Sequence, residues 1–259
     1  MAARQVLAAP RQVITSARQV LTKRRQQNFA FPYLLQVNGT TNDISVAAFN
    51  PTGNTGQSLT AWAWMKGDMA QTGRYIFGQI DFGASTNTRA WLLFCSLGGN
   101  LQVLLSYDGT GSTKNYLSTK FILDNFYHLV AFTWNNGTLK LYVDGEETPV
   151  TKLNDLAMTA ITNFNAKVAL GSGYSNGVVV GRFGGLLGHC GTAPVVATAE
   201  QIRDLFYEGV VSLSSTSGLW NTTEGSGTTL TDTSGNGRNM TITNGTWVTN
   251  TPRGARQGL

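Results

Sequence analysis

The sequence predicts an all-β protein, a two-sheet antiparallel sandwich, and three observations support this. Residues 133–145 form a strand, an Asn-Gly turn and a second strand, and Asn and Gly tolerate the positive φ angles of a tight hairpin turn. The 30 glycines and the low charged fraction of 13% are typical of proteins with many tight turns. Short apolar runs separated by turn residues recur along most of the chain. At 259 residues, one large sandwich is expected rather than two small domains.

The predicted strands begin close to residue 31 and follow one another at short intervals. The segment 59–65 alternates along its length as a strand does, and its neighbours are apolar runs of similar length. We expect strands at 31–37, 44–49, 59–65, 75–80, 90–95, 101–107, 127–134, 139–143, 167–170 and 178–180.

One segment in the C-terminal half of the chain, residues 198–207, is predicted to be a short helix. Thr198 suits the N-cap position, and Gly209 suits the left-handed residue that closes a helix. The apolar face of this helix consists of Ile202, Leu205 and Phe206.

Residues 1–28 differ in kind from the rest and are interpreted as a basic arm, extended or helical. The first 25 residues contain six basic residues and no acidic one, which leaves 13 basic and 14 acidic residues in the remainder. The body of the protein is therefore almost neutral. Because phosphate binding needs a concentrated basic face, nucleic acid is an unexpected partner for the body.

The arm contains the sequence Arg-Gln-Val-Leu/Ile three times at a spacing of seven residues, which would align its apolar side chains if it were helical. Pro10 would place the start of such a helix at or after it. A helix this short is not stable alone and needs another segment or protein to pack against. The candidate docking residues are Arg4, Val6, Leu7, Arg11, Val13, Ile14, Arg18, Val20, Leu21, Arg24 and Arg25. An oligomerising or docking arm, a disordered basic tail and an organelle transit peptide remain open.

The order of motifs over roughly residues 31–250 resembles the laminin-G-like, concanavalin A-like jelly roll of lectins and glucanases. The motifs that carry the resemblance are Leu35-Gln-Val-Asn-Gly39 with Asp43-Ile-Ser-Val46, Leu59-Thr-Ala-Trp-Ala-Trp64, His128-Leu-Val-Ala-Phe-Thr-Trp134, Leu141-Tyr-Val-Asp-Gly145, and Phe183-Gly-Gly-Leu-Leu-Gly188 with the helix after it.

One motif is displaced relative to this family. The Gly-Ser-Gly-Thr-Thr-Leu segment with its Asp-x-Ser-Gly-Asn-Gly turn opens the domain in many members, whereas here it spans residues 225–237. We therefore expect the usual first strand to be supplied last. With the basic arm in front of it, this arrangement resembles proteins of tailed-phage particles.

The sequence offers no support for catalysis, so a non-enzyme is predicted. Glucanases of this fold use paired carboxylates on a Glu-x-Asp-x-Glu strand, and that triplet is absent. The acids of 144–147 are read as solvated turn residues. His128 is expected to face the core or a neighbouring sheet. Cys95 and Cys190 have no metal-ligand spacing and are expected to be buried thiols, with a disulfide between them left open.

Two sites follow from the resemblance. No cofactor is required, but calcium is the family's usual ion, and Asp232 and Asn236 are its candidate ligands. Both residues could instead only stabilise their turn. For sugar binding, which uses an aromatic platform and polar side chains, the candidates are Trp91, Tyr107, Asp108, Asn115 and Tyr116, although core packing explains Trp91 equally well.

The leading functional hypothesis is a virion structural protein, a capsid decoration, head fibre or spike subunit that assembles in the host cytoplasm. Its arm, 1–28, would dock on capsid or other virion proteins and support a homo-oligomer, with a trimer favoured. Its sandwich, 29–252, would display a lectin-like surface, and 253–259 would be a tail. The alternative is a free carbohydrate-binding module. No segment is long and apolar enough to span a membrane.

Overall fold

The computed structural model describes residues 31–53, 55–70, 73–83, 88–111, 113–209 and 212–250. The eleven predicted docking residues of the arm and the predicted tail lie outside these ranges. Among the described residues, no helix is long and apolar enough to cross a membrane.

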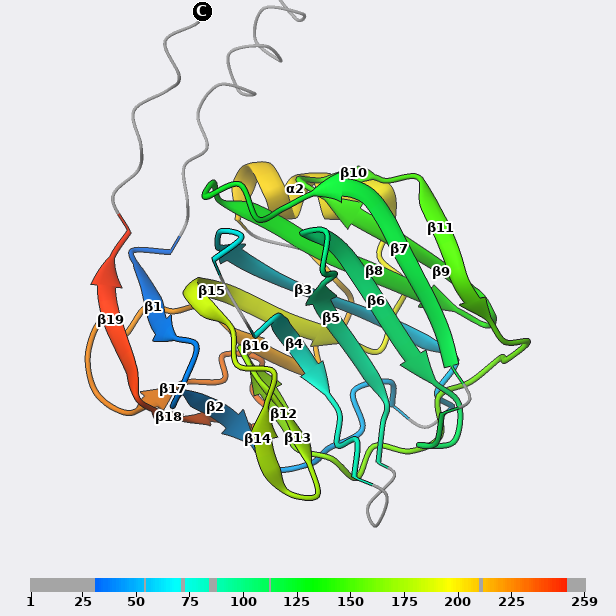
Figure 1. Cartoon of the computed structure of the whole chain (residues 1–259), viewed down its shortest axis with the longest axis horizontal. Coiled ribbons are helices and arrows are strands. Elements are labelled where there is room, and N and C mark those ends of the chain that lie inside the picture. The colour runs from blue at the N-terminus through cyan, green and yellow to red at the C-terminus, as the bar shows by residue number, and fades with distance from the viewer. Residues whose placement is uncertain are drawn as a thin grey trace, which may run out of the picture.

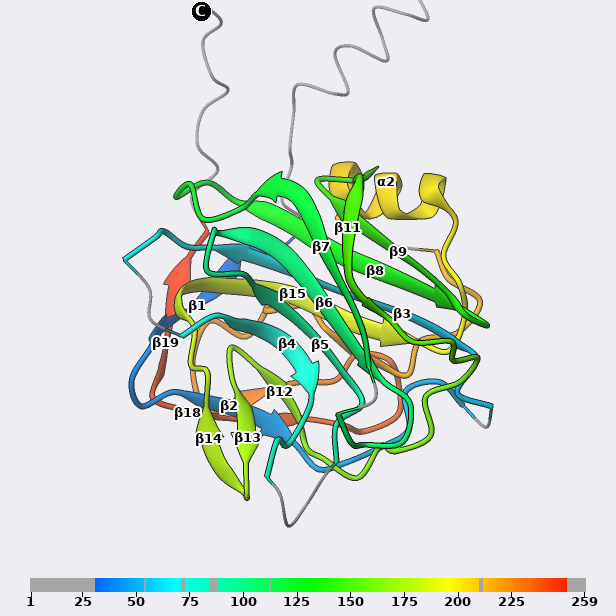
Figure 2. The same cartoon turned by 45° about the vertical axis from the view of Figure 1, so that its right-hand side comes forward.

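Two large antiparallel sheets pack face to face (Figures 1 and 2). The eight-stranded sheet has the order β10-β9-β8-β3-β15-β1-β19, and β16 pairs with β15. Its strands are β1 (Tyr33–Asn38), β3 (Ser58–Lys66), β8 (His128–Asn135), β9 (Thr138–Val143), β10 (Glu146–Glu147), β15 (Gly184–Ala193), β16 (Gly218–Trp220) and β19 (Gly245–Thr249).

The nine-stranded sheet has the order β11-β7-β6-β5-β4-β12-β2-β18-β17. Its strands are β2 (Asp43–Val46), β4 (Tyr75–Gln79), β5 (Trp91–Cys95), β6 (Asn100–Ser106), β7 (Thr113–Phe121), β11 (Val150–Asp155), β12 (Val168–Leu170), β17 (Thr229–Leu230) and β18 (Met240–Thr243). A separate hairpin joins β13 (Gly173–Ser175) to β14 (Val178–Val180). The predicted all-β sandwich is confirmed.

The hairpin turn between β8 and β9 has the geometry that its sequence predicts. Asn136 and Gly137 have φ angles of 41° and 102°, both in the region that Asn and Gly tolerate best. Trp134, just before the turn, is fully buried between the sheets.

The C-terminal segment joins both sheets beside the first strands of the chain. β19 pairs with β1, and β18 pairs with β2. This is the position expected for a strand that the sequence supplies last instead of first. Residues 31 and 250 consequently lie together, and Asn250 N donates a hydrogen bond to Pro32 O at 2.8 Å.

β3 is buried on both faces, and alternate residues serve two different cores. Ala61 and Ala63 face the layer between the sheets, whereas Trp62 and Trp64 face the opposite side. There they pack with the single described helix, α2 (Ala199–Glu208), which covers the outer face of the eight-stranded sheet.

The helix has the ends that the sequence predicts. Thr198 and Gln201 form a capping box, and Gly209 closes the helix with a φ of 68°. Ile202 and Leu205 are buried, and the ring of Phe206 stacks on Trp64 at 5.5 Å.

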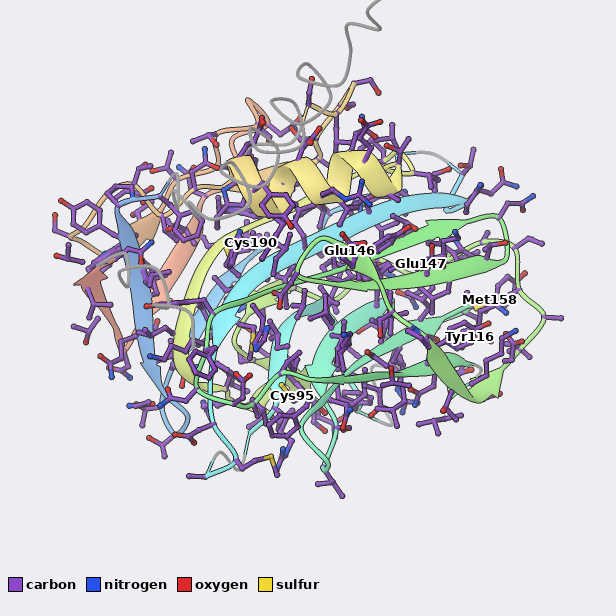
Figure 3. The ribbon with its side chains drawn as sticks, turned by 90° about the horizontal axis from the view of Figure 1, so that it is seen from above. Cys95, Tyr116, Glu146, Glu147, Met158 and Cys190 are labelled. Carbon is purple, nitrogen blue, oxygen red and sulfur yellow. The ribbon has the colours of Figure 1, made fainter. Side chains whose placement is uncertain are left out.

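Both cysteines are free and buried, as expected. Cys95 lies on β5 and Cys190 on β15, in different sheets (Figure 3). Burial raises the pKa of Cys95 to about 12 and also raises that of Cys190. Both thiols therefore remain protonated at neutral pH and act as small apolar side chains.

Candidate functional site

A pocket of about 370 Å³ opens where β4 ends, β12 begins and the β13–β14 hairpin turns. Figures 1 and 2 show the hairpin standing beside β12, on the opposite side of the molecule from α2. The lining is polar, charged and aromatic, and consists of Asp81, Thr88, Asn165, Ala166, Lys167, Tyr174 and Gly177. These residues come from three segments of the chain, so the fold alone brings them together.

Asp81 joins two of these segments. Its Oδ1 accepts a hydrogen bond from Gly83 N at 3.1 Å, and its Oδ2 accepts one from Gly177 N at 2.9 Å. Gly177 follows Asn176 in a tight turn in which the two φ angles are 76° and 50°. The carboxylate of Asp81 therefore holds the tip of the β13–β14 hairpin against the loop that follows β4.

Tyr174 is a buried lining residue whose hydroxyl is held by Asp43. The hydroxyl lies 2.9 Å from Asp43 Oδ1 and 3.1 Å from Oδ2. Burial and the Asp43 charge raise the pKa of Tyr174, so the phenol stays protonated and donates. The Nζ of Lys167 lies 5.3 Å from the ring centroid of Tyr174, a cation–π contact. Because Lys167 is exposed, its ammonium is available to a ligand.

The amide of Gln79 fixes the chain that lines the pocket next to Lys167. Gln79 is fully buried, and its Nε2 donates to the carbonyl oxygens of Phe164 at 2.8 Å and Ala166 at 3.0 Å. It also donates to Phe49 O at 2.8 Å. The backbone around Ala166 is thus tied to β4, which gives this part of the pocket a defined shape.

Tyr107 and Asp108 lie on a loop that contacts the pocket segments from both sides. Tyr107 O accepts hydrogen bonds from Thr162 N at 2.8 Å and Thr162 Oγ1 at 2.6 Å, and Gly109 O accepts one from Arg89 N at 3.3 Å. The Tyr107 side chain is 43% exposed. Hydrogen bonds from Thr110 lower the pKa of Asp108, which is therefore ionised at neutral pH.

The other three predicted sugar-binding residues do not join this loop. Trp91 is fully buried in the core, with its ring 5.0 Å from that of Phe77, so its prediction as a platform is wrong. Asn115 and Tyr116 are consecutive on β7, and consecutive strand residues point to opposite faces. Tyr116 packs between the sheets, while the Asn115 amide oxygen accepts a hydrogen bond from Gln102 at 2.7 Å.

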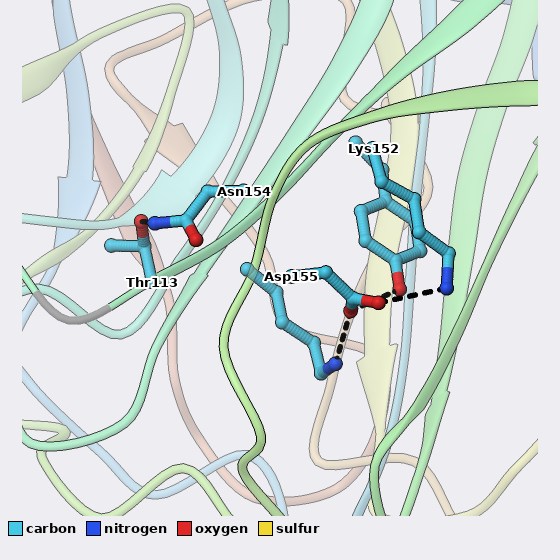
Figure 4. Close-up of polar contacts among 6 residues, drawn as sticks. Thr113, Lys152, Asn154 and Asp155 are labelled. Carbon is cyan, nitrogen blue, oxygen red and sulfur yellow. Dashed lines mark hydrogen bonds and ion pairs between the residues drawn. The ribbon is translucent and has the colours of Figure 1, made fainter.

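Tyr116 belongs instead to a charged cluster at the edge of the nine-stranded sheet (Figure 4). Asp155 on β11 accepts hydrogen bonds from Lys114 Nζ at 2.5 Å, Tyr116 Oη at 2.6 Å and Lys152 Nζ at 2.8 Å. These contacts hold the pKa of Asp155 far below its usual range, and the hydrogen bond from Lys114 makes the largest contribution. The side chain of Lys114 is only 6% exposed, so the cluster fixes a buried cation and secures β11 to β7.

The two predicted calcium ligands organise a turn. Asp232 Oδ1 accepts hydrogen bonds from Leu219 N at 3.0 Å and Ser234 N at 2.9 Å, and Oδ2 accepts one from Arg238 N at 2.8 Å. Asn236 Nδ2 donates to Thr216 O at 3.0 Å. Within the described ranges no three acidic, histidine or cysteine side chains are grouped as metal ligands would be. Calcium binding stays a prediction.

Asp144 is a partly exposed turn residue, and its carboxylate also contacts other residues of the protein. Its Oδ2 lies 2.9 Å from His128 Nδ1, and its Oδ1 accepts a hydrogen bond from Leu129 N at 3.1 Å. The other ring nitrogen of His128 lies 3.0 Å from Asp124 Oδ1. His128 is buried, and its ring bridges two carboxylates.

Sequence reasoning missed the pocket because its residues are ordinary loop residues in the sequence. Asp81, Asn165 and Lys167 form no motif, and their spacing along the chain exceeds that of any local site. The one local signal is Asn176-Gly177, which identifies the hairpin turn but not what it covers.

Residues 38–203 match the family model described as the concanavalin A-like lectin/glucanases superfamily. No curated protein matches the chain. A Bacteroides ovatus protein to which carbohydrate binding is ascribed is 18% identical, with a TM-score of 0.59 over 85% of this chain, which spans 60% of that protein. The CBM40 of a Ruminococcus gnavus IT-sialidase, bound to alpha2,3 sialyllactose, is 13% identical, with a TM-score of 0.51 over 67% of this chain and 96% of that one. At such identities these likenesses concern the fold alone. The matched span covers well over half of the sequence, and the chain belongs to the concanavalin A-like lectin/glucanase superfamily.

Proposed function

We propose that this protein binds carbohydrate without catalysis, at the pocket beside the β13–β14 hairpin. The observation that carries the proposal is the fixed pocket itself, which the exposed side chains of Asn165 and Lys167 line together with the aromatic ring of Tyr174. Sugars are held by hydrogen bonds to such side chains and by packing of a ring face on an aromatic residue. The structural neighbours named above, one of them bound to sialyllactose, support this class of ligand.

The pocket is suited to a small polar ligand because its framework is already hydrogen bonded. The Asp81 carboxylate, the Gln79 side-chain nitrogen and the Tyr174 hydroxyl are hydrogen bonded within the protein, which leaves the shape of the pocket set before a ligand arrives. Less ordering is then required on binding. The exposed groups, Asn165 and Lys167, can donate to sugar hydroxyls.

For the whole chain we propose a virion structural protein that displays this sandwich, with residues 1–28 as the docking arm. The support is in the sequence: an arm with six basic residues, three of them in a motif repeated every seven residues, precedes an almost neutral body. Capsid or other virion proteins would be the partners, a trimer the favoured oligomer, and the virion, assembled in the host cytoplasm, the location. A free carbohydrate-binding module is the alternative, and the arm experiment in the Discussion separates the two.

A glycan array probed with the full-length protein tests the binding proposal. We expect a defined group of glycans to bind, and Lys167→Ala or Asn165→Ala to weaken binding about tenfold, the loss expected for one hydrogen bond to a charged or polar group. Lys120→Ala, an exposed lysine on β7 that does not line the pocket, is the matched control. A chelator arm tests calcium at Asp232 and Asn236. The proposal fails if no glycan binds, or if both pocket variants bind as the control does.

A further inference from the structure

His128 lies at the start of β8, outside the pocket, with both ring nitrogens facing carboxylates. Nδ1 is 2.9 Å from Asp144 Oδ2, and Nε2 is 3.0 Å from Asp124 Oδ1. The ring is buried, with the residue 8% exposed, whereas the side chains of Asp124 and Asp144 are 34% and 35% exposed. Asp124 comes from the loop after β7 and Asp144 from the turn after β9, so the ring bridges two separate segments.

Both contacts are hydrogen bonds only when the ring is doubly protonated. An ionised carboxylate only accepts, and a neutral imidazole has a single N–H to donate. Burial of the ring lowers the pKa of His128, but the hydrogen bonds and charges of Asp144 and Asp124 outweigh burial and raise it above the usual value. The same contact lowers the pKa of Asp124.

The other charged groups nearby are engaged elsewhere. Lys66 follows Met65, the residue of β3 that pairs with His128. The Nζ of Lys66 lies 5.4 Å from the centroid of the Tyr127 ring. Asp68 pairs with Asp124 through a backbone bridge, and Asp68 Oδ1 accepts a hydrogen bond from Ala70 N at 3.0 Å.

The helix side contributes one further ion pair. Arg203 Nε lies 3.3 Å from Glu146 Oε1, next to the turn that carries Asp144. Asp124 and Asp144 are accordingly the two carboxylates whose charges act on the pKa of His128.

The two contacts differ in what else holds the carboxylate. Asp144 accepts a second hydrogen bond, from Leu129 N, and sits in a tight turn with a φ of 54°. Asp124 belongs to a loop, where its other partner is Phe126 N, two residues away in the same loop. A neutral ring has a single N–H, which would stay hydrogen bonded to Asp144 because that carboxylate is held more firmly. The lone pair on Nε2 of the ring would then face Asp124.

The loop that Asp124 anchors carries one exposed apolar side chain, Phe126, and other exposed apolar side chains occur on nearby parts of the chain. Phe121 and Phe126 are 44% and 38% exposed, Met69 is 45% exposed, and Leu97 is 85% exposed. A side chain added at Gly99 would touch both Phe121 and Met69, so the loops carrying these residues meet there.

We propose that His128 is a pH-dependent latch: when protonated it ties segment 124–127 to the turn after β9, and when it loses its proton it loosens that segment. The inference is independent of glycan binding. Below the titration of His128 the segment is also held through the Asp124 side chain. Above it, backbone contacts such as Asn125 N to Gly67 O remain, and the buried side chains of Ile122 and Leu123 keep the chain before the segment in the core. The loss of this tie increases the mobility of Phe126 and of the residues beside it in the chain.

The test combines a histidine titration by NMR with amide hydrogen exchange of the full-length protein between pH 5 and 10. Exchange is expressed as protection factors, which remove the intrinsic pH dependence of the chemistry. The amides of segment 124–127 should lose about tenfold protection across the titration of His128, the loss expected for one charge-assisted hydrogen bond. Strands β5 and β6 should be unaffected.

Two variants separate a latch from a merely structural histidine. Asp124→Asn removes one carboxylate and should move the His128 titration to lower pH together with the loss of protection. His128→Gln should give protection that does not vary with pH. The proposal is overturned if wild-type protection is constant across the His128 titration, or if His128→Gln shows the same pH profile. Should His128→Gln fail to fold, the wild-type and Asp124→Asn titrations decide.

Discussion

At the scale of single residues, burial separates two histidines that look alike in the sequence. His189 on β15 is 5% exposed, with its ring 6.2 Å from that of Trp62 and 5.9 Å from that of Phe31. Burial lowers the pKa of His189 to about 4, whereas the flanking carboxylates raise that of His128. The two residues therefore affect stability at opposite ends of the pH scale.

His189 should make the folded protein sensitive to acid. Its folded pKa of about 4 lies below the ordinary value of 6.5, so the unfolded chain takes up the proton first as pH falls. The free energy of unfolding should drop by on the order of 1 kcal/mol per pH unit from this residue between these values. His189→Phe, an apolar ring for an aromatic environment, should remove that contribution.

Urea unfolding at pH 7 and pH 4.5 checks this. Relative to the wild type, His189→Phe should have a higher free energy of unfolding at pH 4.5 than it has at pH 7. A difference that is the same at both pH values would contradict the assigned burial of the neutral ring.

Asp155 is expected to contribute more to the free energy of unfolding than a member of a surface ion pair does, because its partner Lys114 is buried. Asp155→Ala leaves the Lys114 ammonium, 6% exposed, without its carboxylate. We expect a loss of about 2 kcal/mol in the free energy of unfolding, below the full cost of breaking a buried pair because the Asp155 side chain is 36% exposed. Lys152→Ala removes the exposed partner and should cost clearly less than Asp155→Ala. Equal costs for both variants in denaturant unfolding would refute the distinction.

At the scale of elements, α2 was recognisable because its signals are local. Its cap, its apolar face and its closing glycine all lie within a dozen consecutive residues, and all have the predicted roles. The β8–β9 hairpin was recognisable for the same reason. β11 was not predicted, because its six residues are exposed or partly exposed and carry no alternation. It is a strand because of Lys114, Tyr116 and β7, none of which is near it in the sequence.

The capping box of α2 gives a prediction at this scale. Thr198→Ala should lower the free energy of unfolding by about 1 kcal/mol, since Gln201 N loses its side-chain acceptor. Thr198→Ser keeps the hydroxyl and is the control, which should remain within a few tenths of the wild type. Thermal unfolding followed by circular dichroism compares the three. An unchanged midpoint in Thr198→Ala would show that α2 is held by its packing on Trp64 alone.

At the scale of the whole molecule, both ends of the sandwich leave it at one place. β1 and β19 are neighbours, so residues 31 and 250 lie side by side. Segments attached at either end therefore start from the same point on the body, which suits a protein whose body is displayed by an arm.

Deleting residues 1–28 tests the arm. The sandwich should remain folded, because the described residues of both cores all lie at position 31 or later and are kept in the shortened protein. Light scattering and co-sedimentation with particles should show that the shortened protein no longer forms oligomers or joins particles. A shortened protein that assembles as the full one does would rule out the docking arm, and with it the argument for a virion protein.

The sequence by itself determined the fold class, the helix with both its ends, the tight turns and the late position of the last strands. Each of these depends on a few neighbouring residues or on motif order, which a linear chain displays. The tertiary structure alone decided the pocket, the Lys114–Asp155 cluster and the His128 bridge. Their members lie on different strands and loops, and whether Trp91, Asn115 or Tyr116 faces a core or solvent depends on what packs against each face of a sheet.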